Sequence, residues 1–129
     1  MPNIKTNFNS ITNELSIKIK DRYECKILCT LNKSNYPILD INQLPTELQK
    51  TACDLGVLGS GVIVLVHRLV YALNTYENIT CNRLTHTGYF IHHIDKNRQN
   101  CNIENLEKLT MAEHRKKHEL PTITLEDFK

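Results

Sequence analysis

The sequence of 129 residues contains no long apolar run. Its longest stretch without a polar side chain has six residues, 61–66, whereas a membrane-spanning helix needs about 20. Residues 1–5 (MPNIK) also lack the apolar stretch of a secretory signal peptide. We therefore expect a cytoplasmic protein without membrane contact. The content of Asn, Ile, Lys and Thr is consistent with an AT-rich genome such as many phages carry.

Cysteine pairs of the metal-binding kind are absent as well. The five cysteines are an odd number, and none belongs to a Cys-x-x-Cys pair. This pattern argues against a disulfide framework and against a four-cysteine zinc site, so we expect buried free thiols. Strong charge is also missing, because 16 basic residues against 14 acidic ones give a net charge of +2. That balance does not by itself indicate a nucleic-acid partner.

A chain of this length with 40% hydrophobic residues has room for one small domain. Residues 13–31 alternate apolar and polar side chains, which predicts two paired strands that turn near residues 21–22. Residues 45–56 carry apolar side chains at helical spacing between a proline and a glycine, which predicts a short helix. The apolar run 62–66 predicts a buried strand, and residues 67–74 predict a second helix.

The last third of the chain predicts the order strand, loop, strand, helix. Residues 84–93 and 106–109 predict the two strands, and residues 94–104 a polar loop between them. Residues 110–113 form a Thr-x-x-Glu capping box, in which each side chain accepts from the backbone N–H of the other residue. A helix is therefore expected over residues 111–119. Strands and helices together place the whole chain in the α+β class.

Histidine is concentrated in this last third, where five of the six histidines lie within residues 86–118. His114 and His118 are four residues apart on the expected helix, so both imidazoles face one side and could bind one divalent ion. The alternative is a solvated basic face. His92 and His93 are successive residues of a strand, whose side chains point to opposite faces. The two should therefore have different functions.

This part of the sequence resembles the HNH nucleases, a ββα-metal superfamily of phage and intron homing endonucleases, some restriction enzymes and nuclease colicins. The resemblance is carried by IHHIDKNRQN (91–100), NIENLE (102–107), LTMAEH (109–114) and His118, and upstream by VHRLV (66–70). Together these residues span positions 62–119. The resemblance implies a small α+β domain with a C-terminal ββα-metal motif, of the phage or homing type but with a colicin-like histidine metal site.

The resemblance also implies a role for each matching residue. His93 matches the general base that takes a proton from the attacking water, and Asn105 matches the asparagine that braces the loop and holds the base in position. His92 and His114 match metal ligands, and His118 matches a third ligand of colicin-like members that many homing enzymes lack. The implied cofactor is one divalent metal ion, Mg²⁺, Mn²⁺ or Zn²⁺. Imidazole ligands favour Zn²⁺ or Mn²⁺ over Mg²⁺, which prefers oxygen.

These residue types suit the hydrolysis of a phosphodiester. The reaction needs a group that titrates near neutral pH to generate the nucleophile, and a cation to neutralise charge on the phosphorane and the leaving oxygen. The resemblance implies an in-line displacement that leaves 5′-phosphate and 3′-hydroxyl ends. Between residues 83 and 117, seven basic residues against four acidic ones give a local charge of +3. The basic residues expected to contact double-stranded DNA are Arg68, Arg98, Arg115, Lys116 and Lys117.

Three functions remain open from the sequence. The first is a phage-type or homing-type endonuclease or nickase, and the second is a homodimeric restriction endonuclease, because one site per chain cuts one strand per binding event. The third is a DNA-binding or packaging accessory protein with a structural metal. In the nuclease interpretations, residues 62–119 form the catalytic core, residues 1–61 contact DNA or mediate dimerisation, and residues 120–129 form a tail.

Overall fold

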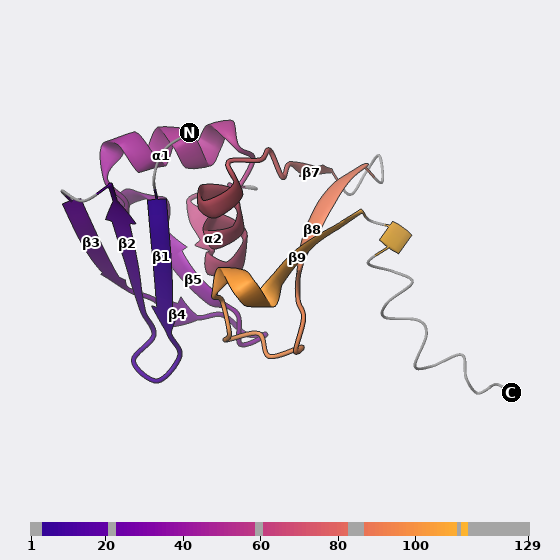
Figure 1. Cartoon of the computed structure of the whole chain (residues 1–129), viewed down its shortest axis with the longest axis horizontal. Helices are drawn as coiled ribbons and strands as arrows, with labels where there is room; N and C mark the ends of the chain where they lie inside the picture. The colour runs from indigo at the N-terminus through magenta and orange to yellow at the C-terminus, as the bar shows by residue number, and fades with distance from the viewer. Residues whose placement is uncertain (1–3, 21–22, 59–60, 83–86, 111, 114–129) are drawn as a thin grey trace, which may run out of the picture.

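Small antiparallel sheets and two α-helices make up the described part of the chain in this computed structural model (Figure 1). The described residues are 4–20, 23–58, 61–82, 87–110 and 112–113. Strands and helices are interspersed along the sequence, and the sheets are antiparallel, so the fold class is α+β, as the sequence predicts.

The first sheet is an antiparallel meander of three strands. These strands are β1 (Ile4–Asn9), β2 (Glu14–Ile19) and β3 (Tyr23–Leu28). The register places Leu15 between Phe8 and Ile27, and all three side chains are buried. The pairing of β2 with β3 confirms the strand pair predicted over residues 13–31, while its turn lies outside the described residues. Strand β1 was not predicted, because four of its six side chains are polar and only Ile4 and Phe8 are apolar.

The second sheet corrects one expectation from the sequence. It contains β4 (Thr30–Leu31), β5 (Pro37–Asp40) and β6 (Ile63–Leu65). The prediction of a buried strand over residues 62–66 is wrong in part, because only Val64 of β6 is buried, whereas Ile63 is 49% exposed. Strand β6 covers the core with one face only, so its apolar residues alternate between core and solvent. The last residue of the predicted run, Val66, already belongs to the following helix.

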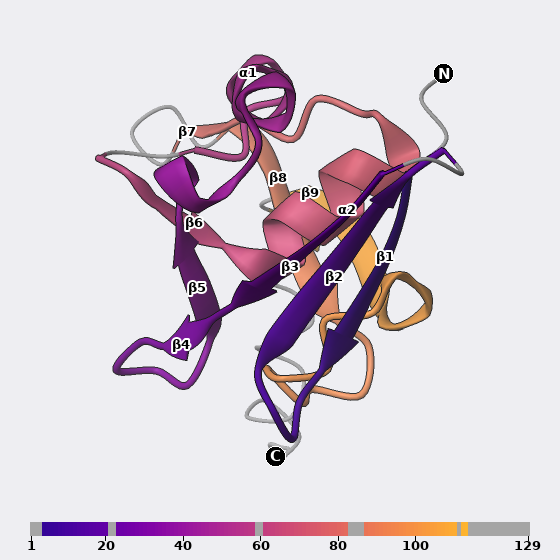
Figure 2. The same ribbon diagram turned by 90° about the vertical axis from the view of Figure 1, so that its left-hand side faces the viewer.

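Both predicted helices are present, as α1 (Thr46–Asp54) and α2 (Val66–Thr75). Helix α1 buries Leu48 and Ala52. Helix α2 buries most of its side chains, because it lies between the first sheet and the C-terminal hairpin (Figures 1 and 2). This central helix joins the N-terminal strands to the part of the chain that carries the clustered histidines.

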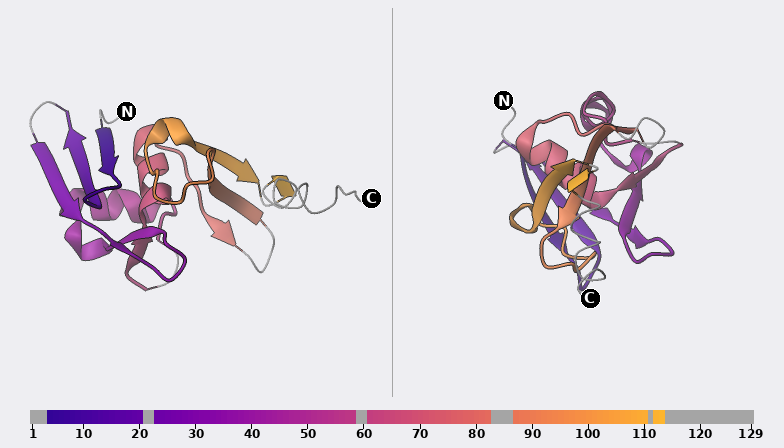
Figure 3. Two further views of the ribbon diagram at one scale, coloured as in Figure 1. Left: turned by 90° about the horizontal axis from the view of Figure 1, so that it is seen from below. Right: turned by 90° about the vertical axis from the view of Figure 1, so that its right-hand side faces the viewer.

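The third sheet contains β7 (Cys81–Asn82), β8 (Thr87–His93) and β9 (Leu106–Thr110). Strands β8 and β9 confirm the predicted strand pair and form a hairpin that extends away from the body of the molecule (Figure 3). The capping box after β9 is confirmed, since the Glu113 carboxylate accepts from the Thr110 N–H at 2.8 Å and the Glu113 N–H donates to the Thr110 hydroxyl at 3.2 Å. Ala112 and Glu113 are helical, and the rest of the expected helix lies outside the described residues.

One apolar core runs through the described residues from Ile4 to Leu106. Buried free thiols are confirmed for Cys29 and Cys101, but Cys53 on α1 is exposed. Within the described part of the chain, no helix is long and apolar enough to span a lipid bilayer.

A pair of glycines provides a test of local packing. At Gly56, φ is +76°, and an added Cβ would lie 2.7 and 2.8 Å from the backbone N and Cα of Thr80. At Gly61, φ is +72°, but a Cβ would meet nothing within 4 Å among the described residues. We expect Gly61→Ala to lower the free energy of unfolding by about 1 kcal/mol, the strain of a left-handed residue. Gly56→Ala should cost about 3 kcal/mol, because the backbone contact adds to that strain. If urea denaturation shows the same decrease in the free energy of unfolding for both variants, the close approach of Thr80 to Gly56 is contradicted.

Candidate functional site

His92 and His93 end strand β8 and lie on opposite faces of the hairpin. In the register of β8 with β9, His92 stands opposite Glu107 and His93 opposite Leu106. Leu106 belongs to the core, so His93 faces the body of the protein and His92 faces the other side of the hairpin. The structure thus separates the two histidines, as expected from their adjacent positions in a strand.

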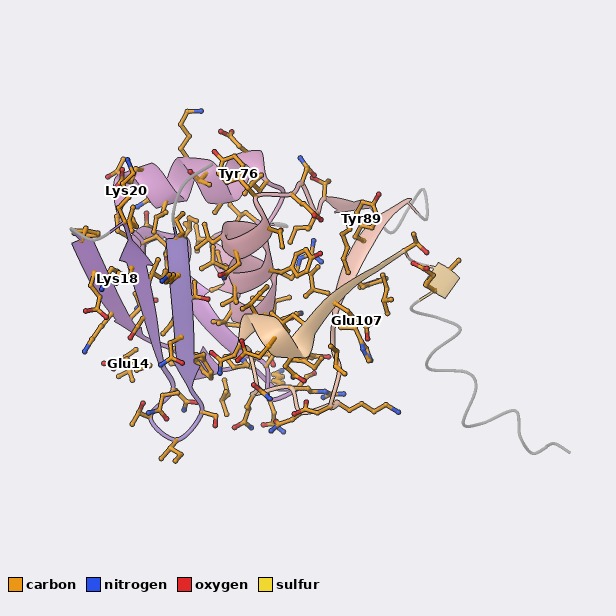
Figure 4. The ribbon with its side chains drawn as sticks, viewed as in Figure 1. Glu14, Lys18, Lys20, Tyr76, Tyr89 and Glu107 are labelled. Carbon is orange, nitrogen blue, oxygen red and sulfur yellow. The ribbon has the colours of Figure 1, made fainter. Side chains whose placement is uncertain are left out.

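On the face of the hairpin that carries His92, the ring lies against a carboxylate. Its Nδ1 is 3.2 Å from Oε2 of Glu107, and the imidazole is 8% exposed. Figure 4 shows Glu107 on β9. In metal sites, a ligating histidine commonly donates one ring N–H to such a carboxylate and binds the metal through its other nitrogen. The sequence analysis missed Glu107, because the pairing appears only once the register across the 94–105 loop is known.

The metal site implied by the resemblance extends beyond the described residues. The expected ligands His114 and His118 lie outside the described part of the chain, as do Arg115, Lys116 and Lys117. Among the residues that are described, no group of three or more His, Cys, Asp or Glu side chains could hold a metal ion. The imidazole of His92 and the carboxylate of Glu107 are nevertheless donor types that fit a divalent ion. These two residues would form the strand side of such a site.

On the body side of the hairpin, His93 packs in a cluster of three rings. Its ring centre lies 4.7 Å from that of His67 at the start of α2, and 5.9 Å from that of Tyr36 in the turn between β4 and β5. Tyr36 and His67 are stacked with their ring centres 5.3 Å apart. Tyr36, His67 and His93 together are called the three-ring cluster below. Nε2 of His93 lies 3.8 Å from Sγ of Cys101, and only 5% of His93 is exposed.

Burial keeps the two imidazoles of the cluster neutral. Burial, together with the nearby His92 and Arg98, lowers the pKa of His93 to about 4, although Asp95 opposes the shift. Burial also lowers the pKa of His67 well below its usual value, with further contributions from His93 and Arg68. At neutral pH the imidazole of His93 therefore has a lone pair that can accept a proton. Burial raises the pKa of the Cys101 thiol to about 12, so the group beside Nε2 is a thiol rather than a thiolate.

The loop that follows His93 is held by Asn105. Its Oδ1 accepts from the N–H of Asp95 at 3.1 Å, and its Nδ2 donates to Oδ1 of Asp95 and to the carbonyl of Asn100, each at 3.0 Å. The Asp95 carboxylate also accepts from Nδ2 of Asn100 at 3.0 Å and from the Asn97 N–H at 2.7 Å, and these hydrogen bonds lower its pKa. Asn105 is therefore placed to fix the shape of residues 94–105, and with it the end of β8.

The two described arginines among the expected DNA contacts differ in their surroundings. Nη1 of Arg68 donates to the carbonyl of Tyr89 at 3.1 Å and Nη2 donates to the carbonyl of Ile79, so this partly buried guanidinium links α2 to the hairpin. We interpret Arg68 as a structural link rather than as a DNA contact. Arg98 is exposed, and its Nη1 donates to the carbonyl of Ser34 at 2.7 Å. The sequence analysis missed this contact, which joins residues 64 positions apart.

His67 packs at the junction of β6 with α2, as its place in the sequence indicates. Its Nδ1 is buried and has no hydrogen-bond partner among the described residues. The only sequence signal was its position at the junction of a strand with a helix.

A comparison with family models gives one match. The model of the HNH endonuclease family matches residues 84–116, which include β8, the Asn105 loop, β9 and the capping box. No match was found among curated proteins or among solved structures. Residues 84–116, which carry His92, His93 and Asn105 in the geometry described above, are thus similar to the HNH endonuclease family.

Proposed function

We propose that this protein is a metal-dependent endonuclease that hydrolyses phosphodiester bonds of double-stranded DNA, of the phage or homing type. The observation that carries the proposal is the separation of two histidines by one strand of the family-matched hairpin. His92 pairs with a carboxylate on one face, and His93 is a neutral imidazole on the other. Phosphodiester hydrolysis needs a metal ligand and a base that do not compete for the same ion.

In the proposed reaction, His93 accepts a proton from the water whose oxygen attacks phosphorus. The bond from phosphorus to the 3′ oxygen breaks in line with the attack, which leaves 5′-phosphate and 3′-hydroxyl ends. Asn105 keeps the loop after His93 in one shape, so the imidazole stays where the water is bound. His92 would hold the metal together with His114 and His118. A divalent ion bound there would neutralise charge on the phosphate and the leaving oxygen.

Glu107 supports this arrangement by acting on His92. A carboxylate that accepts from Nδ1 fixes the ring orientation and the tautomer, and makes the other nitrogen a stronger donor to a metal. Since Glu107 stands directly opposite His92 in the ladder, backbone pairing keeps the two side chains together. We therefore include Glu107 in the proposed metal site as a positioning residue.

A plasmid-cleavage assay tests the proposed reaction. We expect wild-type protein to convert supercoiled plasmid to open circles with Mg²⁺, Mn²⁺ or Zn²⁺, and EDTA to abolish cleavage. His93→Gln should lower the rate by about 100-fold or more, because the general base is lost while a polar side chain of similar size remains. Cys53→Ser, on the exposed face of α1, is the matched control and should cut at the wild-type rate.

The same assay separates the alternatives. Open circles that accumulate without linear product indicate a monomeric nickase, since one chain carries one His93. Linear product at the earliest times indicates a homodimer that cuts both strands. Absence of cleavage with all three ions would refute the enzyme and leave a DNA-binding protein with a structural metal.

Metal affinity tests the role of Glu107. We expect Glu107→Gln to weaken Zn²⁺ or Mn²⁺ binding by 10- to 100-fold in titration calorimetry of the metal-free protein, the usual effect of losing such a carboxylate. Glu104→Gln is the matched control, because Glu104 is exposed three residues earlier in the chain. If both variants bind the ions as tightly as the wild type, Glu107 does not belong to the metal site. His118→Ala in the same experiment shows whether the expected helix supplies a further ligand.

A further inference from the structure

The side chain of Arg98, in the loop that follows His93, reaches the turn between β4 and β5, residues 32–36. The turn is held by its own residues. The Asn32 side-chain oxygen accepts from the N–H of Ser34 at 2.9 Å and from that of Tyr36 at 3.0 Å. The Asn32 N–H donates to the carbonyl of Tyr36 at 2.9 Å, and Asn35 adopts a left-handed φ of 67°, which asparagine tolerates. A turn fixed in this way can position what it touches.

What the turn touches is the exposed guanidinium of Arg98. Besides the hydrogen bond to the Ser34 carbonyl, the guanidinium carbon of Arg98 lies 4.9 Å from the ring centre of Tyr36. Fixing an arginine side chain costs up to about 2 kcal/mol of conformational entropy. An exposed cation–π contact returns about 0.5–1 kcal/mol, and an exposed hydrogen bond adds little more. These contacts therefore contribute little to stability, and in the structure they place the guanidinium between the Ser34 carbonyl and the Tyr36 ring.

The charge of Arg98 is not balanced by a carboxylate. Among the described residues Arg98 forms no ion pair, and neither do the exposed lysines Lys33 in the turn and Lys96 in the loop. The nearest acidic residue in sequence, Asp95, uses its carboxylate in hydrogen bonds to Asn97, Asn100 and Asn105. With Asp95 and Glu104 as their acidic residues against Lys33, Lys96 and Arg98, the two segments carry a net charge of +1, and the exposed guanidinium can meet an anionic partner.

The same turn also contacts the proposed base. Tyr36 belongs to the three-ring cluster, so its ring is in contact with His93 and with the Arg98 guanidinium. A guanidinium has five N–H donors in a planar fork, and the Ser34 carbonyl uses one of them. The remaining donors match the two oxygens of a phosphate.

We infer that the turn of residues 32–36 is part of the nuclease centre, where Ser34 and Tyr36 hold Arg98 toward a phosphate of the DNA next to the His93 site. The inference rests on the proposed function, because it takes DNA as the substrate. It adds a region of the N-terminal half, outside the family-matched residues 84–116, to the substrate site. Tyr36 is a positioning residue, since it acts on the phosphate through Arg98.

A double-mutant cycle tests this inference by binding rather than by cleavage. Anisotropy of a labelled DNA duplex is measured in EDTA at several salt concentrations. Arg98→Ala should weaken binding by about tenfold and reduce the salt slope by about 0.9, the loss of one phosphate contact. Tyr36→Leu should produce a similar loss, and the double variant should lose no more than Arg98→Ala alone. Tyr36→Phe should bind as the wild type does, because the ring that orients Arg98 remains.

Matched controls and a second variant keep the outcome clear. The control variants are Tyr23→Leu on β3 and Lys18→Ala on β2. The side chain of Lys18 lies far from Glu107 in Figure 4. Both variants should bind DNA with the affinity and the salt slope of the wild type. Asn32→Ala loosens the turn without touching Arg98, and it should reproduce the loss seen with Tyr36→Leu even if that variant folds poorly.

The results distinguish this inference from the proposed function. Additive losses for Tyr36→Leu and Arg98→Ala, or normal binding by Tyr36→Leu and Asn32→Ala, would overturn the role of the turn while leaving the nuclease proposal intact. A wild-type protein that neither binds nor cuts DNA would instead refute the proposed function.

Discussion

The pairing of β8 with β9 is the interaction on which the rest of the site depends. A slip of one residue would move His92 to the body side of the hairpin and His93 away from it, because side chains alternate along a strand. The long connection between the strands does not by itself set the register. Asn105 does so at the strand end, where its carbonyl accepts from the Ile94 N–H at 2.8 Å while its side chain holds Asp95. The asparagine of the motif thereby acts on both histidines through the backbone.

On the body side of the hairpin, Tyr36 and His67 from earlier in the chain pack against His93. His67 is buried, its Nδ1 has no hydrogen-bond partner within the described part of the chain, and a buried nitrogen without a partner costs about 1–3 kcal/mol. An apolar side chain would pack there without that cost. The position of His67 follows from helix α2, which joins the first sheet to the hairpin. Arg68 on the same helix donates to a carbonyl of the hairpin and so fixes the distance between helix and hairpin. The rings of Tyr36 and His67 therefore reach His93 as a consequence of how the core is assembled.

Features that depend on residues close together in the sequence could be predicted, whereas contacts between residues far apart in the sequence could not. The pair β2 and β3, helix α2 and the Thr110–Glu113 box were predictable because periodicity and capping are local signals. Strands of two to four residues, such as β4 and β5, carry too little alternation to recognise. Glu107 required the register across a loop, and Tyr36 required a contact made over more than 50 positions. Neither relation leaves a periodic trace in the sequence, so the partners of both histidines appeared only in three dimensions.

The distribution of charge shows why a near-neutral chain can present a basic site. Away from the hairpin loop, two lysines form ion pairs: Lys50 pairs with Asp54 at 3.1 Å, and Lys108 pairs with Glu77 at 2.7 Å. Around His93 the nearby carboxylate is used to shape the loop, and the exposed cations have no such partner among the described residues. These cations can attract a polyanion beside the proposed base, although the whole chain carries only +2.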